Sequence, residues 1–76
     1  MRIFLGGHLN FYHPEKDRWL EIDLEHPTPL AGLLNYAGIP LTEVQLVAIN
    51  GEVIDLHDAV VSEGDEVKIF SAVGGG

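Results

Sequence analysis

The chain has 76 residues, of which 46% are hydrophobic, and its 12 acidic and four basic side chains give a net charge of −8. This length allows one small domain, which buries only roughly 60% of the surface that its unfolded chain exposes, and it excludes a second domain. The chain is too apolar to be disordered, and no apolar run approaches the roughly 20 residues that span a bilayer. We therefore expect a soluble globular domain with no membrane partner.

The negative charge repels phosphate backbones, so nucleic acid is not expected as a partner. The charge could simply keep the protein soluble, or it could attract a basic surface on a partner protein. Cysteine is absent, which removes disulfides, thiolate metal sites and a cysteine nucleophile. The N-terminal MRIFLGG looks like a strand and not like a signal peptide, so we expect a cytoplasmic protein.

The first part of the chain predicts a strand followed by a long connection. Residues 2–5 read as a strand with Ile3 and Leu5 facing inward and Phe4 facing outward. Residues 6–18 are polar and contain a proline, which is typical of a long hairpin connection. Part of it, residues 9–12, could extend the strand.

The next part predicts a second strand and the main helix. Residues 19–24 alternate between outward residues, beginning with Trp19, and inward apolar ones, as a half-buried strand does. Thr28 could supply a capping hydroxyl, with Pro29 at the first helical position. Four apolar side chains then follow the i, i+3, i+4, i+7 pattern of a helix that packs on a sheet, and these are Leu30, Leu33, Leu34 and Ala37. Gly38 and Pro40 are typical of residues that end a helix.

The last part predicts a tight hairpin and a final strand. Residues 44–49 form an apolar run, and Asn50-Gly51 is a strong signal for a two-residue turn because both residues tolerate positive φ. A short return strand at 52–55 and a loop or helical turn at 56–61 lead to a strand that starts near Glu66. This order predicts an α+β fold of the β-grasp type, with a mixed sheet of four to five strands, one main helix across one face, and the last strand parallel to the first.

The last strand is expected to present side chains on both faces of the sheet. Alternation places Val67 and Ile69 inward and Lys68 and Phe70 outward. Phe70 would then share the helix-free face with Phe4, with one side of the strand at 44–49 nearby. Such an exposed apolar patch commonly marks a protein-binding surface. The alternative is that a small sheet simply cannot cover both of its faces.

Three glycines follow this strand, so we divide the chain into a domain at 1–73 and a flexible tail at 74–76. The glycines are compatible with a frayed end. They are also compatible with a terminus that enters a narrow channel in extended form and presents its carboxylate to ATP in the active site of another protein.

Several segments resemble the ubiquitin-like sulfur carriers of the ThiS/MoaD family. The similar segments are VAINGE at 47–52, GDEV at 64–67, Phe70, Val73 and the terminal Gly75-Gly76. The resemblance implies a non-enzymatic carrier whose Gly76 carboxylate is adenylated by a partner that resembles ubiquitin-activating enzymes. The acyl-adenylate is then converted to a thiocarboxylate that delivers sulfur to a synthase in molybdopterin or thiamine thiazole biosynthesis.

The resemblance also implies roles for particular residues. Gly74 and Gly75 would enter the active site of the partner, which uses ATP, while the carrier itself binds no cofactor. Phe70 and Val53 match apolar contacts with the activating enzyme, and with Phe4 they form the predicted partner-binding patch. Two departures leave the acceptor pathway open. Ser71-Ala72 stands where the molybdopterin branch usually has Pro-Pro, and the connection at 6–18 has no clear counterpart.

Two other functions stay open from the sequence, namely a ubiquitin-like modifier conjugated through Gly76 and an interaction module whose tail is inert. Histidines at 8 and 13 flank a tyrosine, and His57 lies between Asp55 and Asp58, but neither pattern has the spacing of a strong metal site. We therefore expect no metal site and no catalytic residues.

Overall fold

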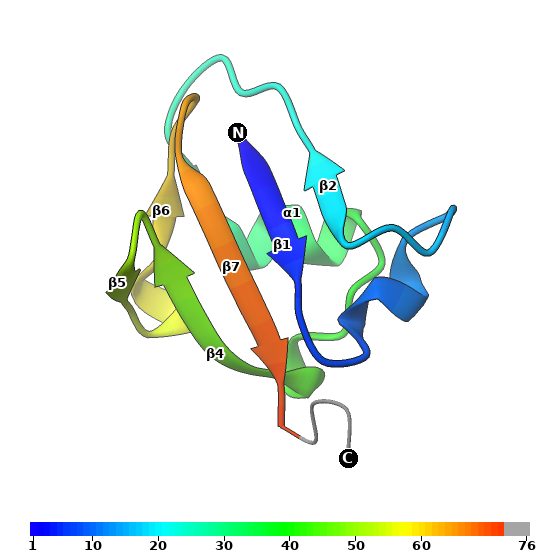
Figure 1. The fold of residues 1–76 in the computed structure, drawn as a ribbon. Coiled ribbons are helices and arrows are strands. Elements are labelled where there is room, and N and C mark those ends of the chain that lie inside the picture. Colours follow the sequence, from blue (N-terminus) through cyan, green and yellow to red (C-terminus); the bar gives the residue numbers. More distant parts are fainter. Residues whose placement is uncertain (73–76) are drawn as a thin grey trace.

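The computed structural model describes residues 1–72 and contains the mixed sheet that the order of elements predicts (Figure 1). Five strands pair in the order β2-β1-β7-β4-β5. The pairing of β1 with β7 is parallel and the other pairings are antiparallel. The strands are β1 (Arg2–Leu5), β2 (Trp19–Glu21), β4 (Val44–Ile49), β5 (Glu52–Val53) and β7 (Glu66–Ser71). The predicted boundary between a domain at 1–73 and a tail at 74–76 lies outside the described residues.

One α-helix, α1 (Leu30–Tyr36), crosses one face of this sheet (Figure 1). Its predicted end is confirmed. Gly38 adopts a φ of 80°, which costs a glycine little because it has no Cβ. The N–H of Gly38 donates to the carbonyl of Asn35 at 3.1 Å, and the N–H of Ile39 donates to the carbonyl of Leu34 at 2.9 Å. These two bonds form a Schellman motif, which satisfies carbonyls that the end of a helix leaves unpaired.

The predicted start of α1 is wrong, because Thr28 does not cap it. Thr28 and Pro29 form a short strand, β3 (Thr28–Pro29), that pairs with β6 (Val60–Val61) in a second, two-stranded sheet. The hydroxyl of Thr28 donates to the carbonyl of His26 at 2.9 Å. The first N–H of the helix, that of Leu30, donates to the carbonyl of Ala59 at 3.0 Å instead. A tertiary backbone contact therefore replaces the expected side-chain cap.

The connection between β1 and β2 does not extend the strand, which corrects the prediction for residues 9–12. These residues form a 3-10 helix, η1 (Leu9–Tyr12). Gly7 has a φ of 64°, a left-handed conformation that turns the chain away from the direction of β1. Two further 3-10 turns, η2 (Leu41–Glu43) and η3 (Leu56–Asp58), lie before β4 and β6. The turn expected within 56–61 is thus present, while β6 was not expected, and β2 and β5 are shorter than predicted.

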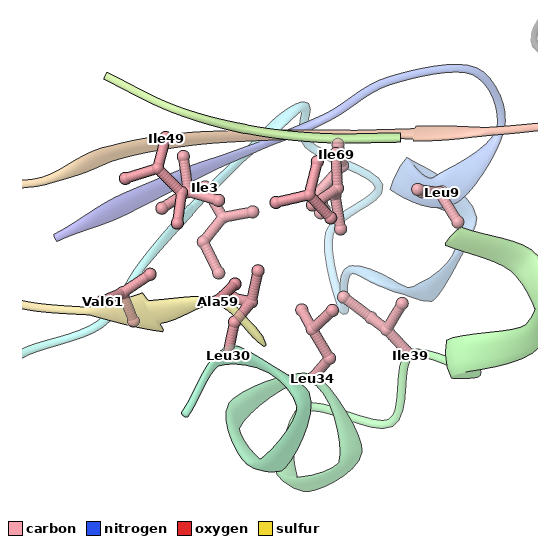
Figure 2. Packing of buried hydrophobic residues seen from close by; sticks show 12 residues of the cluster. Ile3, Leu9, Leu30, Leu34, Ile39, Ile49, Ala59, Val61 and Ile69 are labelled. Atoms are coloured by element: carbon pink, nitrogen blue, oxygen red, sulfur yellow. The ribbon is translucent and has the colours of Figure 1, made fainter. Parts of the chain in front are cut away.

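The core lies between the inner face of the sheet and α1 (Figure 2). Leu30 and Leu34 of α1 and Leu9 of η1 have no exposed surface. They pack with the inward residues of the sheet and with Ile39, Ala59 and Val61 from the loops and β6. The connection at 6–18 is thus part of the core through Leu9. Burial of a side chain of this size contributes about 1.5–3 kcal/mol to stability. Within the described residues, no helix is long and apolar enough to cross a membrane.

Asn50 connects the tight hairpin to the start of β7. Asn50 and Gly51 have φ angles of 51° and 88°, as the predicted two-residue turn requires. The side-chain amide of Asn50 donates to Oδ1 of Asp65 at 2.9 Å, and its oxygen accepts the N–H of Glu66 at 2.9 Å. The hydrogen bond from Asn50, and then the one from the backbone N–H of Ser62, lower the pKa of Asp65. Asn50 therefore fixes the first residue of β7 as well as the turn.

Two replacements of Asn50 should separate the contribution of its side-chain hydrogen bonds from that of its backbone conformation. Asn50→Gly keeps the positive φ and loses both side-chain bonds, so it should lower the free energy of unfolding by about 1–2 kcal/mol. Asn50→Ala adds backbone strain and should cost about 1 kcal/mol more. Urea unfolding monitored by circular dichroism measures both, with Asn35→Ala on the exposed face of α1 as the control. An Asn50→Gly variant as stable as the wild type would contradict the role of the side chain.

Candidate docking face

The face of the sheet opposite α1 carries a row of side chains that crosses all five strands. Neighbouring Cα partners in this row are Trp19, Phe4, Lys68, Ala48 and Val53. A second row, nearer the end of β7, pairs Phe70 with Leu46. Residues directly opposite on adjacent strands lie about 4.5–5.5 Å apart and contact each other. The two rows, which we call the docking face, are therefore continuous.

Three aromatic side chains form a cluster on the docking face. The rings of Phe4 and Trp19 have centroids 5.2 Å apart in an edge-on arrangement, and those of Phe4 and Phe70 are 6.0 Å apart. Such offset geometries are favoured by the ring quadrupoles. The Arg2 guanidinium lies 3.8 Å from the centroid of the Trp19 ring. As a result Phe4, Trp19 and Phe70 are each half-buried.

The structure brings Phe4 and Phe70 together, as alternation predicts, and it places Val53 farther away. Lys68 and Ala48 lie between Phe4 and Val53 in the row. Val53 is 65% exposed, so its contact surface is available on the same face of the sheet. The structure thus places these three residues on one surface, while their binding to a partner stays a prediction.

Gly6 leaves room for the ring of Phe70. The backbone N–H of Gly6 donates to the carbonyl of Ile69 at 2.7 Å, which continues the pairing of β1 with β7. A Cβ on Gly6 would lie 2.7 Å from Cε1 of Phe70, closer still to Cδ1, and 3.0 Å from the Ile69 carbonyl oxygen. The Phe70 ring therefore occupies the space where any other residue would have its side chain.

Trp19 and Leu46 were not predicted to belong to the patch. Alternation indicated that Trp19 faces outward, and the predicted hairpin placed its strand beside the first, but the contact between the Trp19 and Phe4 rings was not predicted. For Leu46, the sequence left two faces open, because residues 44–49 are apolar on both. The structure buries Val47 and Ile49 and leaves Leu46 42% exposed, so Leu46 and Ala48 belong to the docking face.

The connection at 6–18 is also hydrogen-bonded to η2. The hydroxyl of Tyr12 donates to Oε2 of Glu43 at 2.5 Å. This hydrogen bond to a carboxylate, and then desolvation, raise the pKa of Tyr12. The connection, β2 and α1 together enclose a groove of about 430 Å³, lined mainly by apolar side chains. The lining of this groove contains no lysine or arginine that could bind a phosphate.

The absence of a metal site stays a prediction. Among residues 1–72, one set of three possible ligands converges, namely His13, Glu15 and Asp17, whose ligand atoms lie within 4.8 Å of one another. Nδ1 of His13 already accepts the N–H of Glu15 at 2.9 Å. The N–H of His57 donates to Oδ1 of Asp55 at 2.9 Å, which caps the η3 turn. His13 and Asp55 thus have structural partners, and they lie in loops outside the docking face.

Comparison with protein families assigns the chain to one family. The ThiS family matches residues 13–76. The chain belongs to the ThiS family. Members of this family are small sulfur carriers with a β-grasp fold, they are not enzymes, and they generally work with activating enzymes and sulfur transferases. This membership supports a role as a sulfur carrier in cofactor biosynthesis. The comparison with curated proteins found no match.

The match to the ThiS family begins at His13. Residues 1–12, which contain β1 and η1, lie outside the matched segment, although β1 is hydrogen-bonded to the centre of the sheet. Two residues that shape the docking face, Phe4 and Gly6, therefore lie outside the family match. Alternation predicted Phe4, and the structure shows the fit of Gly6 against Phe70.

A methyl group at Gly6 should disturb the docking face, while one at Gly32 should not. Gly6→Ala forces the Phe70 ring or the end of β7 to shift, and overpacking of this kind lowers the free energy of unfolding by about 1–3 kcal/mol. A Cβ on Gly32 in α1 meets nothing within 4 Å, and alanine is the better helix former, so Gly32→Ala should stabilise by roughly 0.5 kcal/mol. Urea unfolding of both variants measures the difference. Equal stability of Gly6→Ala and the wild type would show that the ring is not confined by Gly6.

Proposed function

We propose that this sulfur carrier is activated at the carboxylate of Gly76 by an adenylating enzyme that resembles ubiquitin-activating enzymes. The observation that supports the proposal best is the position of β7, which is the central strand of the sheet and carries Phe70 on the docking face. The chain leaves the sheet after Ser71, directly beside Phe70. A partner that binds the docking face would therefore be adjacent to the segment that leads to Gly76.

The proposed chemistry has two steps, and the partner supplies both. An oxygen of the Gly76 carboxylate attacks the α-phosphorus of ATP, and pyrophosphate leaves, which produces an acyl-adenylate. A hydrosulfide ion then attacks the acyl carbon, and AMP leaves. If the sulfur donor is a protein persulfide, its terminal sulfur attacks the acyl carbon and AMP leaves, and a thiol then cleaves the S–S bond of the acyl disulfide, which forms a disulfide with the donor protein and releases the thiocarboxylate. The adenylate is needed because a free carboxylate is a poor acyl donor. The resulting thiocarboxylate gives its sulfur to an accepting synthase.

In this proposal the folded domain binds and the tail reacts. Phe4, Val53 and Phe70 contact the activating enzyme, while Gly74 and Gly75 enter its active site. Residues without a Cβ can pass through a channel that is too narrow for side chains. The carrier needs no bound cofactor for this role, because ATP binds to the partner.

Intact mass tests the reaction at Gly76. After incubation with a cell extract, ATP and a sulfur donor, the carrier should gain the mass difference between a sulfur and an oxygen atom. A variant that lacks Gly75 and Gly76 should show no gain over its own starting mass and should retain the wild-type unfolding curve.

Two other outcomes of the same experiment would contradict the proposal. Conjugates on larger proteins would indicate a modifier that forms an amide through Gly76. No change in mass, with either the extract or the purified activating enzyme, would indicate an interaction module whose tail is inert.

Truncation of Phe70 should weaken binding to the activating enzyme. If Phe70 is a central contact, Phe70→Ala should cost about 1–3 kcal/mol of binding free energy. Tyr36→Ala is a matched control, because this aromatic side chain is 91% exposed on α1 and lies outside the docking face. Isothermal titration calorimetry with the adenylating enzyme of the same organism measures both. An unchanged affinity of Phe70→Ala would remove Phe70 from the interface.

A further inference from the structure

Three of the four basic side chains in this acidic protein have partners within the domain. Arg2 lies over the Trp19 ring, and its Nε is 3.6 Å from a carboxylate oxygen of Glu66. Arg18 donates to the carbonyls of Leu5 and Gly7 at 2.9 and 2.7 Å. The ammonium group of Lys16 donates to the carbonyl of Phe11 at 2.9 Å. These three cations are thus committed to internal contacts.

Lys68 is different, because within residues 1–72 it has neither a salt bridge nor a side-chain hydrogen bond. It is exposed in the middle of β7, and its Cα partners are Phe4 on one side and Ala48 on the other. Its neighbours two residues away on the same face are Glu66, which is paired with Arg2, and Phe70. Among the described residues, Lys68 therefore places an unpaired cation at the centre of an otherwise apolar and aromatic surface.

A partner that covers this surface must compensate the charge of the Lys68 ammonium group. Its carbon stem can lie along the neighbouring aromatic rings, but the ammonium group stays hydrated in the free protein. Removal of a charge from water without a counter-charge is unfavourable, whereas a well-placed carboxylate offsets that cost. A purely apolar partner surface would be penalised, and a basic one would be repelled.

We propose that Lys68 makes the docking face selective for an activating enzyme that places a carboxylate opposite the Lys68 ammonium group. This inference rests on the proposed function, because it takes the adenylating enzyme as the protein that covers the docking face. It adds a specificity element, since the apolar contacts supply affinity and the single cation discriminates between apolar surfaces that do and do not carry the carboxylate. The whole chain has a net charge of −8, so this local attraction has the opposite sign to the overall field of the molecule.

The test compares Lys68 with another lysine that carries the same charge. We would measure the dissociation constant for the adenylating enzyme of the same organism at low and high salt. Lys68→Met should weaken binding by about 10-fold and Lys68→Glu by about 100-fold at low salt, while Lys68→Arg keeps the charge and should change it by less than about 3-fold. Lys16→Met changes the net charge equally, lies in the connection at 6–18, and should leave the dissociation constant within about 2-fold of the wild-type value. Added salt should weaken the wild type more than Lys68→Met.

The outcomes separate this inference from the proposed function. If Lys68→Met binds as well as Lys16→Met while Phe70→Ala binds poorly, the docking face stands and the role of Lys68 is wrong. If neither Phe70→Ala nor Lys68→Met alters binding, the enzyme does not use this face. If the wild-type carrier does not bind the enzyme at all, both proposals fail. Restoration of Lys68→Glu binding by reversal of one acidic residue on the enzyme would identify the facing carboxylate.

Discussion

The pairing of β1 with β7 is the interaction on which the other features depend. It places the C-terminal strand at the centre of the sheet, with β1 on one side and β4 on the other (Figure 1). Val67 and Ile69 have no exposed surface, while Lys68 and Phe70 lie on the docking face. Side chains of a strand alternate between faces, so a slip of one residue would move Lys68 into the core. The core therefore fixes which residues of β7 are available to a partner.

Contacts near both ends of β7 hold this register. At its start, Asn50 binds the side chain of Asp65 and the N–H of Glu66. Near its end, Gly6 donates to the carbonyl of Ile69 and leaves room for the Phe70 ring. A strand that is paired on both sides and fixed near both ends presents Phe70 in one position. Binding then requires little ordering of the carrier surface, and this reduces the entropic cost of association.

Local patterns predicted the parts of the fold that depend on local physics. Alternation in residues 66–70 identified the inward and outward side chains of β7, and Gly38 marked the end of α1 because a left-handed conformation suits that position. The element order then predicted the parallel neighbours β1 and β7. The match to the ThiS family supports the β-grasp fold that this order predicts.

Features that depend on contacts between distant segments were not predictable in the same way. Thr28 does not cap α1 as expected, because it belongs to β3, which pairs with β6, a strand far from it in the sequence. The fit between Gly6 and Phe70 joins two residues that carry no mutual signal in the sequence. Leu46 was ambiguous because both faces of its strand are apolar, and only the position of α1 decides which face is buried. For the docking face, the sequence thus predicted Phe4, Phe70 and Val53 but not Trp19 or Leu46.

The two departures from the molybdopterin branch, namely the connection at 6–18 and Ser71, are joined by a hydrogen bond. The N–H of His8, in the connection at 6–18, donates to Oγ of Ser71 at 3.3 Å, and Ser71 is 8% exposed at the end of β7. A proline at position 71 has no hydroxyl to accept this bond. The bond is long, so it orients the two segments more than it stabilises them. The unusual connection and the serine are therefore one structural feature, and it acts at the point where the chain leaves the sheet. The contact between His8 and Ser71 thus lies beside Phe70, the aromatic residue that the family resemblance implies as a contact with the activating enzyme.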